Sequence, residues 1–253
     1  MTERKMDIWK YFDVTHRHHV VCNPLSVDKL DALLALCALP AGARVVDIAC
    51  GKGEVLVRLA ERYEIAGTGV DISPYAVADA ERLRDARVPG ADLRFVCQAG
   101  ADWAAASHAP FDLALCMGAE WVFGGLAPTC RRLAELVRPG GLVVVGTPYW
   151  LRTPPEAYLE AEGLVAEDFA PSLRASVATC EAEGLQLLYA AVSAPDDWDR
   201  YEGLQWYAAE AHARAHPDDP DGPEILRRVA RAREIYLRWG RDHCNWALYL
   251  FRR

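Results

Sequence analysis

The 253-residue chain lacks the features that direct a protein to a membrane or to a nucleic acid. It contains no run of about 18 apolar residues, and its opening residues, MTERKMDIWKYFDV, have no apolar signal-peptide core. The formal net charge is −8, so no overall positive field is available to hold a phosphate backbone. We therefore expect a cytoplasmic protein that binds neither a membrane nor a nucleic acid.

The eight cysteines include no Cys-x-x-Cys pair, a spacing typical of zinc and redox sites. Several lie in apolar segments, where a thiol packs like a small hydrophobic side chain. Three of the seven histidines and one cysteine fall between Val14 and Pro24, in VTHRHHVVCNP. Adjacent histidines diverge, and no second group of metal ligands follows until His243 and Cys244, so we expect no metal site.

Short apolar runs alternate with amphipathic segments, which indicates an α/β fold. A hydrophobic content of 52% and a charged content of 25% are ordinary for a globular protein. The runs ARVVDIA, EIAGTGVDIS, ADLRFVCQA, FDLALCMG and GLVVVGT have the pattern of strands buried on both faces. Such strands, connected by helices, predict a doubly wound, mostly parallel sheet. GLQLLYAAVS and CNWALYLFR are expected to add two more strands.

The chain shows no internal repeat and no clear linker, which predicts a single domain over residues 1–253. Residues 1–25 form an arm before the first predicted helix, SVDKLDALLALCAL, which Ser26 or Asp28 can cap. Residues 196–243 form a helical insertion between the last two strands, interrupted by PDDPDGP.

A glycine loop follows the first strand, in VVDIACGKGE. Asp47 precedes this loop and Glu54 follows it, so carboxylates flank the loop and favour a cationic ligand over a pyrophosphate. The second strand ends at Asp71, about twenty residues further on, where a carboxylate can accept both hydroxyl hydrogens of a ribose. The loop alone would also fit any dinucleotide-binding fold.

Four motifs in order, VVDIACGKG, GVDIS, FDLALCMG and LVRPGGLVVVGTP, resemble those of the class I S-adenosylmethionine-dependent methyltransferases. The resemblance covers residues 43–147 as the cofactor-binding core. It implies a Rossmann-like seven-stranded sheet with an antiparallel last strand, S-adenosylmethionine as the methyl donor, and S-adenosylhomocysteine as the product.

The resemblance also implies which residues hold the cofactor. Asp47 would lie near the methionine ammonium, Gly51 and Gly53 would allow a close approach, and Asp71 would bind the ribose with Ile72 against the adenine. Ala49 stands where the family's first glycine would be, and it is small enough for the loop to form. The remaining implied cofactor positions are Ala99, Gly100, Asp102 and Cys116.

One of these positions departs from the family pattern. After the third strand the family usually has an acidic residue that reaches the adenine amine, but this chain has Ala99 and Gly100 there. Either Asp102 serves instead, from a reshaped loop, or the backbone does.

The flanking segments GTPYW, DDWDRYEGLQW and NWALYLFRR are similar to a subgroup of small bacterial methyltransferases that act on small molecules. Ligands in such sheets lie beyond the carboxyl ends of the strands, and this position predicts that Glu120, Trp121, Tyr149 and Trp150 surround the methyl group. The insertion adds Trp198, Tyr201 and Trp206, although aromatic residues at helical spacing are as often core as site. These side chains favour a substrate with an apolar, planar or amine part.

Candidate catalytic residues come from the arm and from two strand ends. His16 or His19 could act as a general base if the arm folds over the site, and Glu120 is a second candidate base, with Tyr149 beside it. Alternatively, the histidines only cap and hydrogen-bond the arm. The sequence leaves open whether the acceptor atom is nitrogen, oxygen or sulfur. It also leaves open whether the protein is a monomer or a homodimer. There are two alternative functions. One is an enzyme that uses an adenosyl or nicotinamide cofactor for different chemistry, and the other is a module that binds S-adenosylmethionine without turnover.

Overall fold

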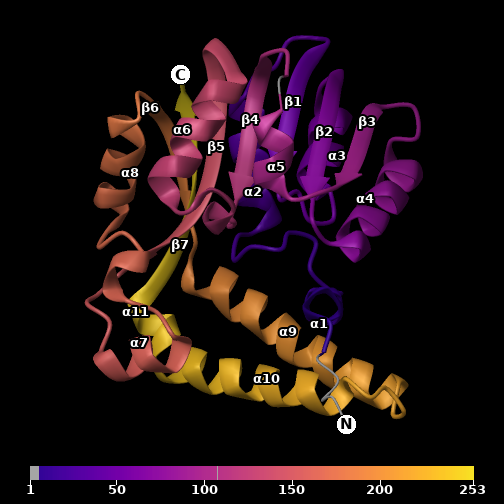
Figure 1. Ribbon diagram of the computed structural model, residues 1–253, viewed down its shortest axis with the longest axis vertical. Helices are drawn as coiled ribbons and strands as arrows, with labels where there is room; N and C mark the ends of the chain where they lie inside the picture. Colours follow the sequence, from indigo (N-terminus) through magenta and orange to yellow (C-terminus); the bar gives the residue numbers. More distant parts are fainter. Residues whose placement is uncertain (1–5, 107) are drawn as a thin grey trace.

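Seven strands form one mixed sheet in the order β3-β2-β1-β4-β5-β7-β6 (Figure 1). The computed structural model describes residues 6–106 and 108–253. The strands are β1 (Ala43–Ile48), β2 (Ile65–Asp71), β3 (Asp92–Cys97), β4 (Phe111–Met117), β5 (Val137–Trp150), β6 (Gln186–Val192) and β7 (Cys244–Arg252). The last strand, β7, runs antiparallel to both β5 and β6. The expected seven-stranded, mostly parallel sheet with an antiparallel last strand is confirmed.

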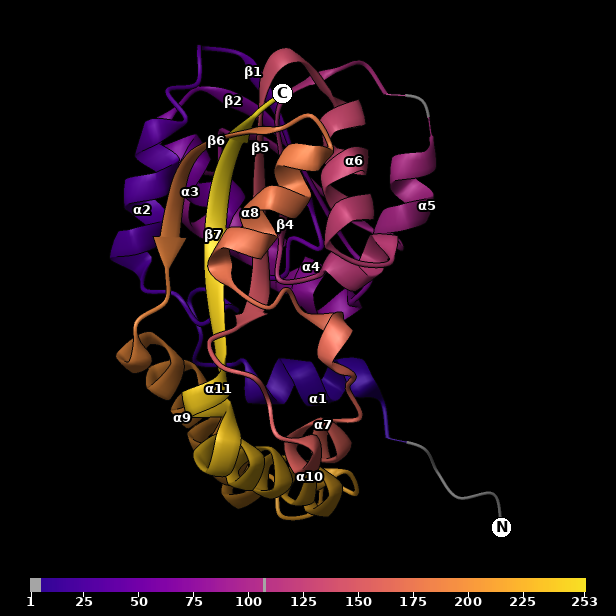
Figure 2. The same ribbon diagram turned by 90° about the vertical axis from the view of Figure 1, so that its left-hand side faces the viewer.

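Helices cover both faces of the sheet (Figure 2). On one face lie α2 (Val27–Leu36), α3 (Glu54–Arg62) and α4 (Pro74–Arg87), and on the other lie α5 (Gly100–Ala105), α6 (Leu126–Leu136) and α8 (Leu173–Ala182). Each face therefore has its own hydrophobic cluster, and the strands between them are buried on both sides.

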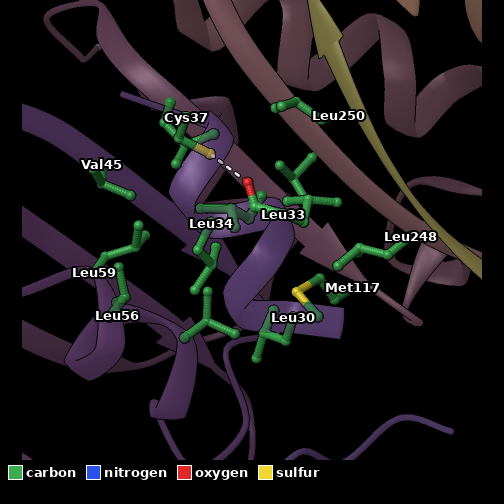
Figure 3. Close-up of a cluster of buried hydrophobic side chains, with 14 of the residues drawn as sticks. Leu30, Leu33, Leu34, Cys37, Val45, Leu56, Leu59, Met117, Leu248 and Leu250 are labelled. Atoms are coloured by element: carbon green, nitrogen blue, oxygen red, sulfur yellow. Dashed lines mark hydrogen bonds between the residues drawn. The ribbon is translucent and has the colours of Figure 1, made fainter. Parts of the chain in front are cut away.

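Helix α2 illustrates how local sequence produces this packing. Its first turn begins where the Ser26 side chain accepts a hydrogen bond from the Lys29 amide. Leu30, Leu33 and Leu34 recur at helical spacing and are fully buried against the sheet. Figure 3 shows them meeting side chains from β1, α3, β4 and β7, namely Val45, Leu56, Leu59, Met117, Leu248 and Leu250.

A third layer of helices lies beneath the carboxyl ends of the strands (Figure 1). It comprises α1 (Ile8–Thr15), α7 (Glu156–Glu162), α9 (Pro195–Ala215), α10 (Gly222–Ile235), the π-helical turn η3 (Tyr236–Gly240) and α11 (Arg241–His243). Val14 of α1, Ala209 of α9 and Val229 of α10 belong to one buried cluster. The arm is thus partly helical and packs on the insertion, a contact that the sequence pattern does not indicate.

Within the described residues, no helix has both the length and the apolar character needed to cross a lipid bilayer. All eight cysteines are free thiols.

Strands β5 and β7 come together closely at a glycine. A Cβ added at Gly146 would overlap the Trp246 ring. We expect Gly146→Ala to lower the free energy of unfolding by about 1–3 kcal/mol, because a rigid indole in a packed core cannot move aside cheaply. Urea unfolding measures this change.

Gly203→Ala is the matched control, since a Cβ there meets no atom within 4 Å. It should raise the stability by roughly 0.5–1 kcal/mol, because alanine favours a helix more than glycine does. An unfolding midpoint for Gly146→Ala equal to the wild type would contradict the close packing.

Candidate functional site

The loop between β1 and α3 is built on left-handed backbone. Ala49, Gly51 and Gly53 have φ values of 59°, 52° and 74°. A Cβ at Gly53 would lie 2.8 Å from both Ala80 and Phe95, so this position has no room for a side chain. Ala49 adopts the left-handed conformation despite its Cβ, at a cost of roughly 1–2 kcal/mol, and the loop still forms.

Asp71, at the end of β2, holds this loop in place. Its Oδ2 accepts a hydrogen bond from the Gly51 amide at 2.8 Å, and its Oδ1 accepts one from the Ser73 amide at 2.8 Å. Burial raises the pKa of the Asp71 carboxyl, while these amides act to lower it. The neighbouring Ile72 is 48% exposed, so its side chain is available to a ligand.

Asp47, at the end of β1, is buried and has an unsatisfied oxygen. Its Oδ1 has no hydrogen-bond partner among the described residues. Burial, together with the charge of Asp71, raises the pKa of Asp47 to about 7. A cationic group beside Asp47 would offset the cost of burying this charge. The loop and its carboxylates therefore fit a nucleoside ligand that also carries an ammonium group.

The loop after β3 closes the same end of the sheet. Ala99 precedes the first turn of α5, and Gly100 packs so tightly that a Cβ would lie 2.6 Å from the Ile48 side chain. Asp102 is exposed in the first turn of α5. The structure thus brings the expected cofactor positions of β1, β2 and β3 to one edge.

Cys116, the implied cofactor position on β4, has a buried side chain. It is 1% exposed and packs in the core beside β1. Burial raises the pKa of its thiol well above the ordinary value, and the charges of Asp47 and Glu120 add to this effect. The thiol therefore lies near the carboxyl groups of both Asp47 and Glu120.

Glu120 opens the short helix η1 (Glu120–Phe123) after β4 and is 9% exposed. Its Oε2 is buried without a hydrogen-bond partner among the described residues. Burial raises the pKa of Glu120, against an opposing hydrogen bond from Thr147. This carboxyl is suited to receive a proton or to pair with a cation.

Tyr149 connects the strand ends to the helical layer through Asn245, a residue that the sequence pattern did not single out. Asn245 donates to the Tyr149 hydroxyl at 3.1 Å and accepts from the Trp198 indole at 2.9 Å. Trp198 in turn contacts Tyr201 edge-on and stacks on Tyr236. The only signal for Asn245 is its position as a lone amide in the apolar run CNWALYLF.

Two predicted substrate residues lie elsewhere. Trp150 is 3% exposed, packs against Tyr158 and Phe169, and donates its indole N–H to the Ala166 carbonyl, so it is a core residue. Trp121 is 71% exposed and does not line a closed pocket. Sequence position placed both tryptophans at strand ends but could not indicate where their side chains point.

The arm contacts the site through His16 and His19, which lie against Tyr201. His16 Nδ1 lies 3.2 Å from the Phe12 carbonyl and Nε2 lies 3.0 Å from the Tyr201 hydroxyl, so both nitrogens are engaged. Burial, with a smaller contribution from His19, lowers the pKa of His16 to about 3. So weak a base is poorly matched to neutral pH, and these contacts favour the alternative in which His16 hydrogen-bonds the arm.

His19 differs from His16 in having a free nitrogen. Its Nε2 lies 2.8 Å from the Tyr201 carbonyl, which makes Nε2 the protonated nitrogen. The Nδ1 is buried and has no partner within the described part of the chain. Burial lowers the pKa of His19 as well. His19 thus keeps an unoccupied lone pair.

Lys52, between the loop glycines, is a second residue that the sequence pattern did not single out. Its ammonium donates to the His16 carbonyl at 2.6 Å, which ties the glycine loop to the arm. Asn23 adds a further tie by donating to the Met117 carbonyl at the end of β4. Neither contact has a signal in the local sequence.

Comparisons with known proteins agree with this geometry. Residues 45–141 match a family model described as a methyltransferase domain. The structure of a SAM-dependent methyltransferase from Thiobacillus denitrificans with S-adenosylhomocysteine is 31% identical, covers 97% of this chain and 99% of that one, and has a TM-score of 0.87. A Geobacter sulfurreducens SAM-dependent methyltransferase with the same ligand is 29% identical, covers 98% and 99%, and has a TM-score of 0.89. A ubiquinone biosynthesis O-methyltransferase of Neisseria meningitidis is 32% identical over 54% of each chain.

His16 makes stability depend on pH. The pKa of His16 is about 3 in the folded chain and near 6.5 in the unfolded chain. Below pH 6.5 the unfolded chain therefore binds a proton that the folded chain does not, and the free energy of unfolding decreases as the pH is lowered. When the pH is lowered from 6.5 to 5, the free energy of unfolding should decrease in both proteins. We expect the decrease to be about 2 kcal/mol smaller in His16→Gln than in the wild type.

Denaturant unfolding at several pH values measures this difference. His18→Gln, at an exposed position of the same stretch, should keep the wild-type slope. Parallel pH profiles for the wild type and His16→Gln would show that His16 is not a buried neutral histidine.

Proposed function

The chain belongs to the S-adenosylmethionine-dependent methyltransferases, and we propose that it methylates a nitrogen, oxygen or sulfur atom of a small molecule with an apolar, planar or amine part. S-adenosylmethionine is the methyl donor and S-adenosylhomocysteine the product. The observations that carry the proposal are the link from Tyr149 through Asn245 to Trp198 and Tyr201, and the unpartnered Oε2 of Glu120 after β4.

In this proposal the cofactor lies across the carboxyl ends of β1, β2 and β3. Asp71 binds the ribose, because a carboxylate that accepts two amides still has lone pairs for two hydroxyls. Asp47 offsets the charge of the methionine ammonium, and Ile72 packs on the adenine. The adenine amine is met by Asp102 or by the backbone near Ala99 and Gly100.

The cofactor supplies an electrophilic methyl carbon on a positively charged sulfur. The chain aligns the nucleophile with this carbon, excludes water and takes up a proton where the acceptor has one to lose. Glu120 and the free Nδ1 of His19 are the groups assigned to the proton. An oxygen or sulfur acceptor requires such a base, whereas an amine can arrive deprotonated.

A small molecule fits the layer that covers the site. The arm, α9 and α10 lie across the strand ends as one packed unit, and in the proposal they act as a lid. A lid encloses a small substrate but obstructs a macromolecule. The Neisseria relative, by its name, methylates an oxygen in ubiquinone biosynthesis, which also supports a small acceptor.

Calorimetric titration tests the cofactor residues. The wild type should bind S-adenosylmethionine and S-adenosylhomocysteine but not NAD. Asp71→Ala should weaken the binding of both by tenfold or more, a loss of about 1.4 kcal/mol. Asp92→Ala, an exposed carboxylate at the amino end of β3, is the control and should bind like the wild type. Asp102→Ala shows whether that side chain meets the adenine, and unchanged binding by Asp71→Ala would contradict the assignment.

Turnover tests the proposed reaction. Incubation with S-adenosylmethionine and a panel of amines, phenols and thiols should release S-adenosylhomocysteine with a methylated product, both measured by mass spectrometry. A truncation that removes residues 1–25 should reduce this turnover, because it removes His19 and the contacts of the arm with Lys52 and Tyr201. Cofactor binding without any product across the panel would instead favour a binding module.

A further inference from the structure

Glu202 lies between two tryptophans on one face of α9. Trp198, Glu202 and Trp206 follow one another at intervals of four residues, so their side chains share this face. Both tryptophans contact Tyr236 of η3, with ring centroids 6.3 and 6.1 Å away. The carboxyl of Glu202 therefore projects from the aromatic side of the insertion.

The charge of Glu202 acts on tyrosines from four elements. Burial is the main cause of a raised pKa at each of them, and the charge of Glu202 raises it further: they are Tyr11 of α1, Tyr158 of α7, Tyr201 of α9 and Tyr236 of η3. Glu202 is thus an acidic group in an aromatic setting that α1, α7, α9 and η3 build together.

No cation in the described part of the chain balances this charge. Among residues 6–106 and 108–253, no lysine, arginine or histidine forms an ion pair with Glu202. Burial, together with the charge of Glu162 in α7, raises the pKa of Glu202 to about 7, against a smaller opposing effect of Trp206. A partly buried carboxyl that lacks a counter-charge is costly unless a cation arrives.

The acidic character continues toward the cofactor edge. Burial raises the pKa of the Cys244 thiol to about 12, and the charges of Glu162 and Glu120 both contribute, so both carboxyls lie near Cys244. Glu120 is itself nine-tenths buried with an unpartnered Oε2. An unpartnered carboxyl oxygen therefore also lies toward the cofactor edge.

We propose that this region is the substrate-recognition site of the enzyme and that it binds an organic ammonium ion, held by Glu202 against the rings of Trp198, Trp206 and Tyr236. The ammonium is attracted both by the carboxylate and by the ring faces, and its apolar part packs on the remaining rings. The inference rests on the proposed function, since it defines the substrate class of that site. Glu202 binds the ammonium group by which the substrate is held, and it is therefore a specificity-determining residue.

A series of ligands that differ in charge tests the inference. The probes are 2-phenylethylammonium, the neutral 2-phenylethanol and the anionic 3-phenylpropionate, with tetramethylammonium as a cation without a ring. Calorimetric titration is done on the full chain saturated with S-adenosylhomocysteine, at pH 8 so that Glu202 is ionised. We expect 2-phenylethylammonium to bind at least tenfold more tightly than the alcohol, and the anion not to bind.

Two variants identify the residue responsible. Glu202→Gln keeps the shape but removes the charge, and the preference for the cation should fall to within about twofold. Glu210→Gln changes an exposed glutamate of the same helix that pairs with Arg214, and it should keep the wild-type preference. S-adenosylhomocysteine binding by Glu202→Gln shows that the variant is folded.

The outcomes separate the two proposals. Equal binding of cation and alcohol by the wild type, no binding of either cation, or an unchanged preference in Glu202→Gln would overturn the ammonium site and leave the methyltransferase proposal intact. Failure of the wild type to bind S-adenosylhomocysteine would overturn the proposed function instead. Tighter binding of cations by Glu202→Gln would overturn the ammonium site too, since removing a carboxylate that holds the cation must weaken binding.

Discussion

The carboxylate of Asp71 is the contact on which the geometry of the site depends. It accepts the amide of Gly51 from one loop and that of Ser73 from the next, and so fixes the ends of β1 and β2 relative to each other. The left-handed backbone at Ala49, which has a Cβ, would otherwise cost free energy without compensation. Because Lys52 follows Gly51 directly, the same contact positions the backbone from which Lys52 reaches the His16 carbonyl of the arm.

Buried acidic groups without a counter-charge give the site its chemical character. Asp47 and Glu120 each have an unpartnered oxygen, and burial raises the pKa of both. An apolar residue of similar size would be more stable at such a position, since an unpaired buried carboxyl is costly. Local violations of good packing at the edge of a well-packed sheet are typical of ligand sites. The positions of these carboxyls, at the ends of β1 and β4, agree with a cofactor and a substrate that meet there.

The sequence predicts what depends on local pattern. The apolar runs identify the strands, the leucine spacing of α2 identifies a buried helix, and the acidic residue that ends β2 marks a nucleotide site by its position after the glycine loop. Contacts between distant segments are different, because no local pattern encodes them. His16 meets Tyr201 across 185 positions, and Trp150 is core because its side chain turns toward Tyr158. The free nitrogen of His19, the Asn245 link and the Lys52 tie all belong to this second kind.

The helix α9 explains why the arm and the aromatic face are coupled. Tyr201 and Glu202 are consecutive, so their side chains diverge by roughly 100° around the helix. Tyr201 receives His16 and His19 from the arm, while Glu202 lies on the face of Trp198 and Trp206. A rotation of α9 would therefore move both sets of contacts together. Three contacts connect the glycine loop to the aromatic face: Lys52 to the His16 carbonyl, the His16 ring to Tyr201, and Tyr201 to Trp198.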